Sequence, residues 1–337
     1  MSQTTPSGSS SVAQTQSRIS HGHFIPVWSR LASLVPDQMR PIGPQILHGK
    51  MAPDKKRHNA AGGFYVTEFD GSSAYGYANK NTSNNPPSCS VGPVSYVNGQ
   101  AVDGKGNFID PDGGTRSVII FGGPGQCGSE VGSFSDSYGQ PSDASSPDAV
   151  HGNIAVGNIF DTSGAGSISV CTLSGGCTAN LTNPNMYEVA GVAMDNSGNC
   201  WASATNSGGT ATLTYFAGCT GSGVAATGYM NSYYGGLDID ASGNLVSISA
   251  FNSEIYVYSG CNPACTLVGG PFPMQGEAVF GHLNKQSMTF ATGDFEFGQV
   301  DVYYYSPTSI TYWYSFNNGL TSSYIVEGVS YNPRSKQ

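Results

Sequence analysis

The stretch VAGVAMDNSGNCWASA (189–204) decides the fold, because it returns 45 residues later as YGGLDIDASGNLVSISA (234–250). A further copy is GQAVDGKGNFID (99–110). Each copy has an apolar stretch, a turn of the form Asp-x-x-Gly-Asn and a second apolar stretch, which predicts a β-hairpin whose Gly or Asn supplies the positive φ of the turn. A third alternating stretch follows each hairpin: SVIIF (117–121), ATLTYF (211–216) and EIYVYSG (254–260).

Two weaker copies of the unit complete the series: PSDASSPDAVHGNIAVGNIF (141–160) and GEAVFGHLNKQSMTFAT (276–292). The positions taken as equivalent are separated by 40 to 52 residues: Gly99, Pro141, Gly191, Gly236, Gly276 and Gly328. A period of about 40 to 50 residues with about four strands per unit indicates a β-propeller blade.

The two ends of the repeat region are each incomplete. GGFYVTEFDGSSAYGYAN (62–79) has a second and a third strand but no opening strand, and VEGVSYNP (326–333) is an opening strand with no continuation. Together they make one blade, and their pairing would remove exposed sheet edges. We therefore expect residues 62–337 to form an all-β, six-bladed β-propeller of four-stranded blades, closed by the C-terminal strand.

Residues 1–61 are expected to be a disordered leader or linker, because they begin with the low-complexity run MSQTTPSGSSSVAQTQS (1–17). This segment holds seven basic and two acidic residues, whereas residues 62–337 hold six basic and twenty acidic ones. An acidic body of this kind repels a phosphate backbone, so nucleic acid is not an expected partner. No run of 18 apolar residues occurs, so no transmembrane segment is expected, and we expect a monomer.

Eight cysteines lie in the propeller region, without a C-x-x-C pair, which favours disulfides over zinc or redox chemistry. The repeat places Cys200 at the start of a second strand and Cys219 just past the adjacent antiparallel third strand, so we expect these two to pair. Cys171–Cys177 and Cys261–Cys265 would close short loops at the outer rim. Cys89 and Cys127 remain as the fourth pair, both after third strands of neighbouring blades. Free buried thiols are the alternative. Disulfides place the protein in an extracytoplasmic, oxidising compartment. No secretory signal is visible in residues 1–61, and we expect that one was removed or mis-assigned.

The repeat, read as Gly-apolar-Ala-apolar-Asp-x-x-Gly-Asn, resembles that of the NHL and streptogramin-lyase-like six-bladed propellers. The resemblance covers about residues 62–333 and is strongest over 191–260. It implies the fold but does not select a function, because this superfold carries binders, scaffolds, lactonases and lyases.

Polar residues flank the aligned opening strands and are expected to line a central channel without any Lys or Arg: Asn98, Gln100, Gln140, Asp143, Glu188, Tyr234, Asp238, Gln275, Glu277 and Glu327. Crowded carboxylates raise one another's pKa unless a cation neutralises them. Oxygen ligands of this type suit Ca²⁺ or Mg²⁺ in the channel. A hydrated channel without any ion is the alternative.

The candidate catalytic residues are Glu277, Glu327 and His282. The streptogramin-lyase resemblance implies a His acting as general acid with a Glu near Mg²⁺, although the repeat alignment places His282 in a turn. His151 is the other histidine of the propeller region. A lactonase-like resemblance would cast Glu327, Asn98 and Asp238 as metal ligands.

The aromatic stretch VYYYSPTSITYWYSF (302–316) is interpreted as two strands of a late blade. Alternate aromatic residues are expected to pack against the neighbouring blades, and packing is the default for the whole stretch. In the alternative, the other residues, among Tyr303, Tyr305, Tyr312 and Tyr314, form an exposed binding platform. The leading interpretation is a binding or interaction module for a small molecule, a glycan or a protein. The alternatives are a metal-dependent lyase or lactonase acting at the channel, and a purely structural surface protein.

Overall fold

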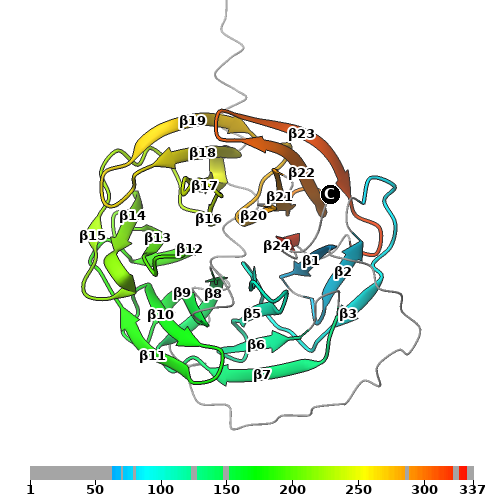
Figure 1. The fold of residues 1–337 in the computed structure, drawn as a ribbon, viewed down its shortest axis with the longest axis horizontal. Coiled ribbons are helices and arrows are strands. Elements are labelled where there is room, and N and C mark those ends of the chain that lie inside the picture. The colour runs from blue at the N-terminus through cyan, green and yellow to red at the C-terminus, as the bar shows by residue number, and fades with distance from the viewer. Residues whose placement is uncertain are drawn as a thin grey trace, which may run out of the picture. The chain divides into compact units, whose positions relative to one another are not determined.

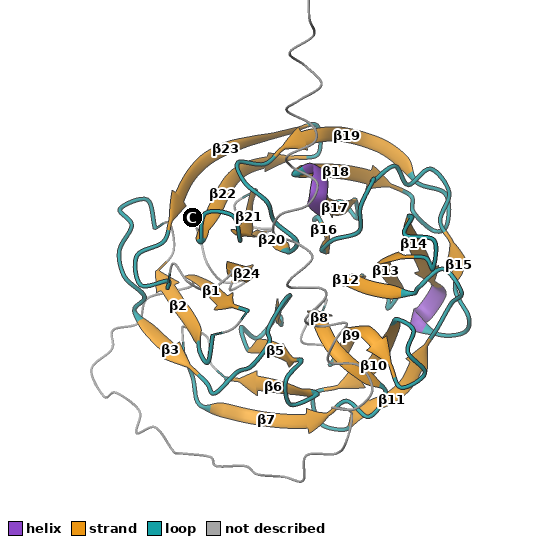
Figure 2. Ribbon diagram, turned by 180° about the vertical axis from the view of Figure 1, so that it is seen from behind, coloured by secondary structure: helices purple, strands orange, loops and turns teal. Residues whose placement is uncertain are grey.

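The computed structural model describes residues 63–69, 71–78, 81–122, 127–146, 152–284, 288–321 and 326–331. The leader predicted over 1–61 and His151 lie outside the described residues. Six antiparallel sheets of four strands each are arranged in a ring (Figure 1), so the predicted six-bladed β-propeller is confirmed. Figure 2, seen from the opposite side, shows the outermost strand of each blade on the perimeter.

We number the blades 1 to 6 along the chain. Blade 1 contains β1 (Gly63–Glu68), β2 (Ala74–Ala78), β3 (Cys89–Val91) and β24 (Val326–Tyr331). Blade 2 contains β4 (Ala101–Val102), β5 (Phe108–Asp112), β6 (Ser117–Phe121) and β7 (Glu130–Ser135). Blade 3 contains β8 (Gly139–Ser145), β9 (Asn153–Asp161), β10 (Ser167–Thr172) and β11 (Gly176–Leu181).

The second half of the ring has the same order of strands. Blade 4 contains β12 (Glu188–Met194), β13 (Cys200–Thr205), β14 (Ala211–Phe216) and β15 (Val224–Ala225). Blade 5 contains β16 (Leu237–Ile239), β17 (Leu245–Ser249), β18 (Glu254–Ser259) and β19 (Thr266–Pro273). Blade 6 contains β20 (Gly281–Asn284), β21 (Thr289–Asp294), β22 (Gln299–Ser306) and β23 (Ser309–Phe316). Two short 3₁₀ helices, η1 (Ala217–Cys219) and η2 (Ala250–Asn252), follow β14 and β17.

The C-terminal strand closes the ring as predicted. β24 is the innermost strand of blade 1 and pairs antiparallel with β1, with Tyr331 opposite Phe64 and Val329 opposite Val66. Every described residue of β24 is buried. Blade 1 is therefore built from both ends of the repeat region.

The Asp-x-x-Gly-Asn motifs form the turns between the first and second strands, as predicted. In blade 4, Asp195 Oδ1 accepts hydrogen bonds from the backbone N of Ser197 (2.9 Å) and Asn199 (2.8 Å), and Gly198 has φ 81°. Asp103 and Asp240 hold the equivalent turns of blades 2 and 5 in the same way. The aspartate selects the turn because its side chain bonds the backbone amides, and glycine accepts the positive φ.

Six clusters of buried apolar side chains are found among the described residues, each at the boundary between two neighbouring blades. The cluster between blades 3 and 4, for example, joins Ile168 to Val192 and Phe216. The aromatic stretch of blade 6 mostly packs in this way, since Tyr303, Tyr305 and Tyr314 are buried and only Tyr312 of the four predicted tyrosines is exposed. Of these four tyrosines, only Tyr312 is therefore left for an exposed platform.

The alignment of the fifth copy also needs correction. A Cβ added to Gly191 would lie 2.7 Å from the Cα of Gly236, and one added to Gly236 would lie 3.0 Å from the Cα of Phe280. Phe280, and not Gly276, is thus the blade 6 equivalent of these glycines. His282 consequently lies within the innermost strand β20, and its predicted position in a turn is wrong.

All four predicted disulfides are present: Cys89–Cys127, Cys171–Cys177, Cys200–Cys219 and Cys261–Cys265. Cys89–Cys127 joins neighbouring blades 1 and 2, while Cys200–Cys219 joins β13 to η1 within blade 4. Four disulfides indicate an oxidising environment. None of the helices in the described ranges has the length and apolar character needed to cross a membrane.

Candidate functional site

The two faces of the propeller are formed by different segments. The segments that lead into the innermost strands share one face with the turns between the second and third strands, because strand directions alternate. Hydrogen bonds join these segments: Tyr187 N donates to the Thr205 carbonyl oxygen (2.7 Å) and Phe295 N to the Glu277 carbonyl oxygen (3.0 Å). We call this side the entrance face, and the side with the Asp-x-x-Gly-Asn turns the turn face.

Tyrosines gather on the entrance face, just before the innermost strands. Tyr187 and Tyr233 expose 45 % and 38 % of their surface, ahead of blades 4 and 5. Half-buried tyrosines occupy related positions ahead of blades 2, 3 and 5, namely Tyr96, Tyr138 and Tyr234. We call these five residues the entrance tyrosines. Phe297, in the turn between β21 and β22, adds an aromatic side chain that is 57 % exposed.

A hydrogen bond joins two of the predicted channel residues across adjacent blades. The Tyr234 hydroxyl donates to Glu188 Oε2 at 2.8 Å, linking the segment before β16 to the start of β12. Burial, and then the neighbouring Glu188 carboxylate, raise the pKa of Tyr234 above its usual value. The phenol therefore stays protonated and keeps donating its hydrogen bond, which holds the carboxylate of Glu188 in position on the entrance face.

The charge on the entrance face is negative. Four of its glutamates are half-buried or exposed: Glu188, Glu254, Glu277 and Glu296. Only two basic residues, Lys105 and Arg116, occur in the described part of the chain. Lys105 belongs to a turn on the turn face, and the Nε of Arg116 donates to the Gly139 carbonyl oxygen at 3.0 Å. Arg116 is thus the single basic side chain described on the entrance face.

The central channel is closed where the innermost strands start. Glycines let these strands approach closely, since a Cβ on Gly328 would lie 2.8 Å from the Asn98 carbonyl oxygen. Phe280 of blade 6 is 1 % exposed, and its Cδ1 would be 2.8 Å from a Cβ added to Gly99 of blade 2. Blades 6 and 2 are not neighbours, because blade 1 lies between them, so the ring of Phe280 crosses the axis.

Beyond Phe280 along the strands, an imidazole lies among carboxylates. His282 Nδ1 is 3.4 Å from Asp238 Oδ2, and the two side chains expose 13 % and 11 % of their surface. Asp238 Oδ2 also accepts a hydrogen bond from Leu283 N at 2.8 Å, which ties blade 5 to blade 6. The structure therefore pairs His282 with Asp238, and an acid–base site at this point would use those two groups.

Asp143 belongs to the same electrostatic group. Its side chain accepts hydrogen bonds from Val192 N (2.8 Å) and Ala144 N (2.9 Å), and the residue is 1 % exposed. Burial raises the pKa of Asp143 to about 7; His282 opposes this rise and Asp238 adds to it. The carboxyl group of Asp143 is therefore poised to change its protonation near neutral pH.

The remaining predicted residues are spread over different environments. Gln100 is fully buried, where its Nε2 donates to the Tyr65 carbonyl oxygen (2.7 Å) and to Ser330 Oγ (3.1 Å). Asn98, Gln140 and Glu327 are also buried, whereas Gln275 is exposed and Glu277 is half-buried before β20. The predicted ring thus includes structural residues between blades as well as residues that reach solvent.

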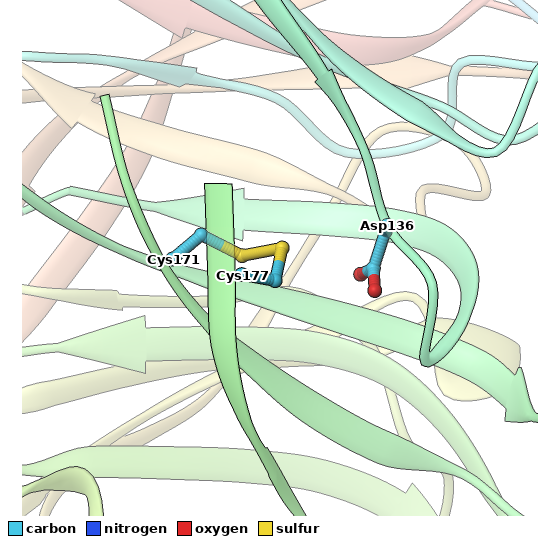
Figure 3. A group of neighbouring side chains, drawn as sticks. All are labelled: Asp136, Cys171 and Cys177. Carbon is cyan, nitrogen blue, oxygen red and sulfur yellow. A yellow bond between two sulfur atoms is a disulfide. The ribbon is translucent and has the colours of Figure 1, made fainter. Parts of the chain in front are cut away.

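The described residues offer one group of three possible metal ligands within 4.8 Å of one another: Asp136, Cys171 and Cys177. Figure 3 shows that the two sulfur atoms of this group are joined in a disulfide, so they provide no thiolate to a metal. In the same part of the chain, Glu277, Glu327 and His282 do not form such a group. The Ca²⁺ or Mg²⁺ expected in the channel stays a prediction.

No family model and no curated protein matches the sequence, so the NHL or streptogramin-lyase resemblance is not confirmed at the level of sequence. The fold is similar to that of a chain in a nidogen–laminin complex, with a TM-score of 0.55 and 12 % identity, covering 81 % of this chain and 100 % of that chain. A protein of unknown function from Bacteroides caccae has a TM-score of 0.55 and 9 % identity, covering 81 % of this chain and 99 % of that one.

A streptogramin B lyase structure also appears among the similar folds, with a TM-score of 0.46 and 12 % identity over 77 % of this chain and 75 % of that one. That similarity is too low to carry an argument. The comparisons establish the shared propeller fold and leave function to the chemistry of the site.

Of the entrance tyrosines, sequence reasoning identified only Tyr234, although the sequence contains a signal for the others. A Ser-Tyr pair precedes the innermost strand of blades 1, 2, 3 and 5, at Ser323, Ser95, Ser137 and Ser232, and Met186-Tyr187 takes that place in blade 4. Tyr324 of the blade 1 pair lies outside the described residues. The position just before the innermost strand lies on the same face of the ring in every blade. A tyrosine that recurs at this position therefore indicates a surface rich in tyrosine on that face.

Proposed function

We propose that this chain is an extracytoplasmic propeller that works as a binding module, and that its ligand or partner docks on the entrance face. The exposed Tyr187 and Tyr233 carry the proposal. Tyrosine supplies a large apolar contact area and a hydrogen-bonding group, which is why binding surfaces are enriched in it. The extracytoplasmic location is supported by the four disulfides.

Two fold neighbours come from assemblies of proteins, a nidogen–laminin complex and a mitotic checkpoint complex. They provide examples of propeller-like chains solved with partners, at 12 % and 11 % identity. The likeness concerns the fold alone, so the proposal rests on the surface of this chain.

The test is an unbiased selection of ligands, using a phage-displayed peptide library and a glycan array with the purified full chain. The entrance variant carries Tyr187→Ser and Tyr233→Ser. A matched rim variant carries Tyr304→Ser and Tyr312→Ser, which change tyrosines of similar exposure, 50 % and 43 %, on the outer strands of blade 6. The proposal expects selected ligands to lose binding to the entrance variant and keep it with the rim variant; equal binding to both variants would contradict it.

A second candidate function, a lyase or lactonase acting at the channel, is favoured by the pairing of His282 with Asp238. In this proposal Asp238 orients Nδ1 of the imidazole, and Nε2 serves as general acid or base. No step is assigned to Ca²⁺ or Mg²⁺, and metal analysis of the purified chain tests for such an ion separately.

Screening lactones and cyclic esters tests this second candidate. Turnover by the native chain that disappears in His282→Asn but survives in Glu277→Gln would support a site built on His282 and Asp238. Turnover that requires Glu277 instead would support the ligand set expected from the sequence. No turnover of any substrate in the panel would count against both enzymatic alternatives and leave the binding module.

A further inference from the structure

Exposed tyrosines and a carboxylate lie on the entrance face at the boundary of blades 4 and 5. Two exposed rings, Tyr187 and Tyr233, each stand next in sequence to a member of the Tyr234–Glu188 hydrogen bond. That bond joins the two blades at 2.8 Å, so the two exposed tyrosines belong to segments that meet at one blade boundary. We call Tyr187, Glu188, Tyr233 and Tyr234 the boundary patch.

The backbone of the boundary patch is held in place. Tyr187 N donates to the Thr205 carbonyl oxygen at 2.7 Å, and Tyr233 N donates to Ser249 Oγ at 3.2 Å. Gly235 N, just after Tyr234, donates to Ser203 Oγ at 3.2 Å. These bonds anchor both segments to strands β13 and β17, so a ligand would meet positioned side chains and less ordering entropy would be lost on binding.

The acidic residues around the boundary patch favour a partner that carries positive charge. The entrance face carries Glu188, Glu254, Glu277 and Glu296 against one basic side chain among the described residues, Arg116. A cationic group approaching Glu188 would gain a charge-assisted hydrogen bond. The same group could lie over the face of Tyr187 or Tyr233 and gain a cation–π contact.

We propose that the entrance face binds a basic peptide segment of a protein partner, whose Lys or Arg side chain lies between Glu188 and the rings of Tyr187 and Tyr233. The proposal rests on the proposed binding function and names the class of its partner. An extended peptide fits because the acidic and aromatic side chains continue along the face, to Glu254 and Glu277 in blades 5 and 6. Anionic segments would be repelled by Glu188, and neutral segments lack the cation–π contact and the charge attraction.

The experiment uses the full chain and a fluorescein-labelled peptide, (Gly-Lys-Gly-Arg)₃, followed by fluorescence anisotropy. The neutral control peptide is (Gly-Gln)₆ with the same label. Glu188→Gln tests the carboxylate and Tyr233→Ser tests the ring. Glu130→Gln and Tyr312→Ser are the matched controls, because both residues are exposed but lie on outermost strands, β7 and β23.

The expected result is binding of the basic peptide only, weakened about tenfold by each boundary-patch variant and less than twofold by each control. Raising the salt from 50 to 300 mM should weaken it further, since exposed charges are screened. Equal binding of the neutral peptide, or no effect of Glu188→Gln, would overturn the proposal. If the unbiased library instead yields ligands that need Tyr187 and Tyr233 but carry no basic residues, the binding function stands and this inference falls.

Discussion

The ring of Phe280 lies against Gly99, and a Cβ atom placed on Gly99 would be 2.8 Å from its Cδ1. The two residues come from blades 6 and 2, on either side of blade 1. The same Cβ would also overlap a carboxylate oxygen of Asp143 in blade 3. One glycine thus makes room for side chains from two other blades, and the channel is closed by packing between them.

Gly99→Ala is predicted to destabilise the protein by about 1–3 kcal/mol, because the new methyl group overpacks a closed site. Chemical denaturation monitored by tyrosine and tryptophan fluorescence measures the loss. Gly132→Ala is the control, since a Cβ at Gly132 meets nothing within 4 Å. Equal stability of both variants would show that Phe280 and Asp143 can move aside at no cost.

Closure of the ring by β24 is predicted to be a major source of stability. Val329 is fully buried between blades 6 and 1, so Val329→Ala should cost about 2 kcal/mol through lost burial and an incompletely filled cavity. Val224→Ala, at a position 55 % exposed, should change the free energy of unfolding by less than about 0.5 kcal/mol. Similar effects at both positions would argue against closure through this strand.

The disulfides are predicted to differ in what they contribute. The chain-entropy model gives roughly 4 kcal/mol for Cys89–Cys127, which spans 38 residues, and roughly 2 kcal/mol for Cys261–Cys265, which spans 4. Double alanine variants of each pair, compared by urea denaturation, measure this order. A larger loss of stability for Cys261–Cys265 than for Cys89–Cys127 would mean that local packing, and not loop closure, determines how much each disulfide stabilises the protein.

The stability of the protein is predicted to fall as pH rises from about 4 to about 7. Burial raises the pKa of Asp143 to about 7, against about 3.9 for an unfolded aspartate, so the folded state binds this proton more tightly. Stability from this group is complete below about pH 4 and is lost as pH rises through 7. Thermal melting across this range should show a shallower fall in Asp143→Asn than in the native chain.

His282→Asn provides the complementary measurement. The imidazole opposes the rise in the pKa of Asp143. Removing it should therefore raise this pKa further, so that stability continues to decrease up to a higher pH. An unchanged pH profile in both variants would place the titrating group elsewhere, for example at Asp301, whose pKa is also raised by burial and then by the neighbouring Asp294.

The fold was predictable from sequence because three of the six blades contain the same turn signal. Asp195 and Asp240 bond the amides of their turns through side chains that the sequence displays directly. The pairing of β24 with β1 followed from counting strands, and the disulfides followed from the positions of cysteines within the repeat. Blade 6 lacks the signal, since Asn284 takes the place of the aspartate, and its opening strand was misaligned.

The site was harder to predict, because it depends on which residues of different blades meet. His282 was placed in a turn since Phe280 stands where blades 1, 2, 4 and 5 have glycine, and only the three-dimensional structure shows that Phe280 crosses the axis. The Tyr234–Glu188 bond joins residues 46 positions apart through the ring geometry. A sequence repeat predicts the number and order of the blades and strands well. Contacts between side chains of different blades depend in addition on the exact register of the strands.

Hydrogen–deuterium exchange of the full chain, with and without the tightest peptide from the displayed library, tests the central claim most directly. Binding at the entrance face predicts slower exchange over residues 186–189 and 232–236, with little change in the turns 103–107, 195–199 and 240–244 of the turn face. Protection confined to those turns, or to the outermost strands, would contradict the account.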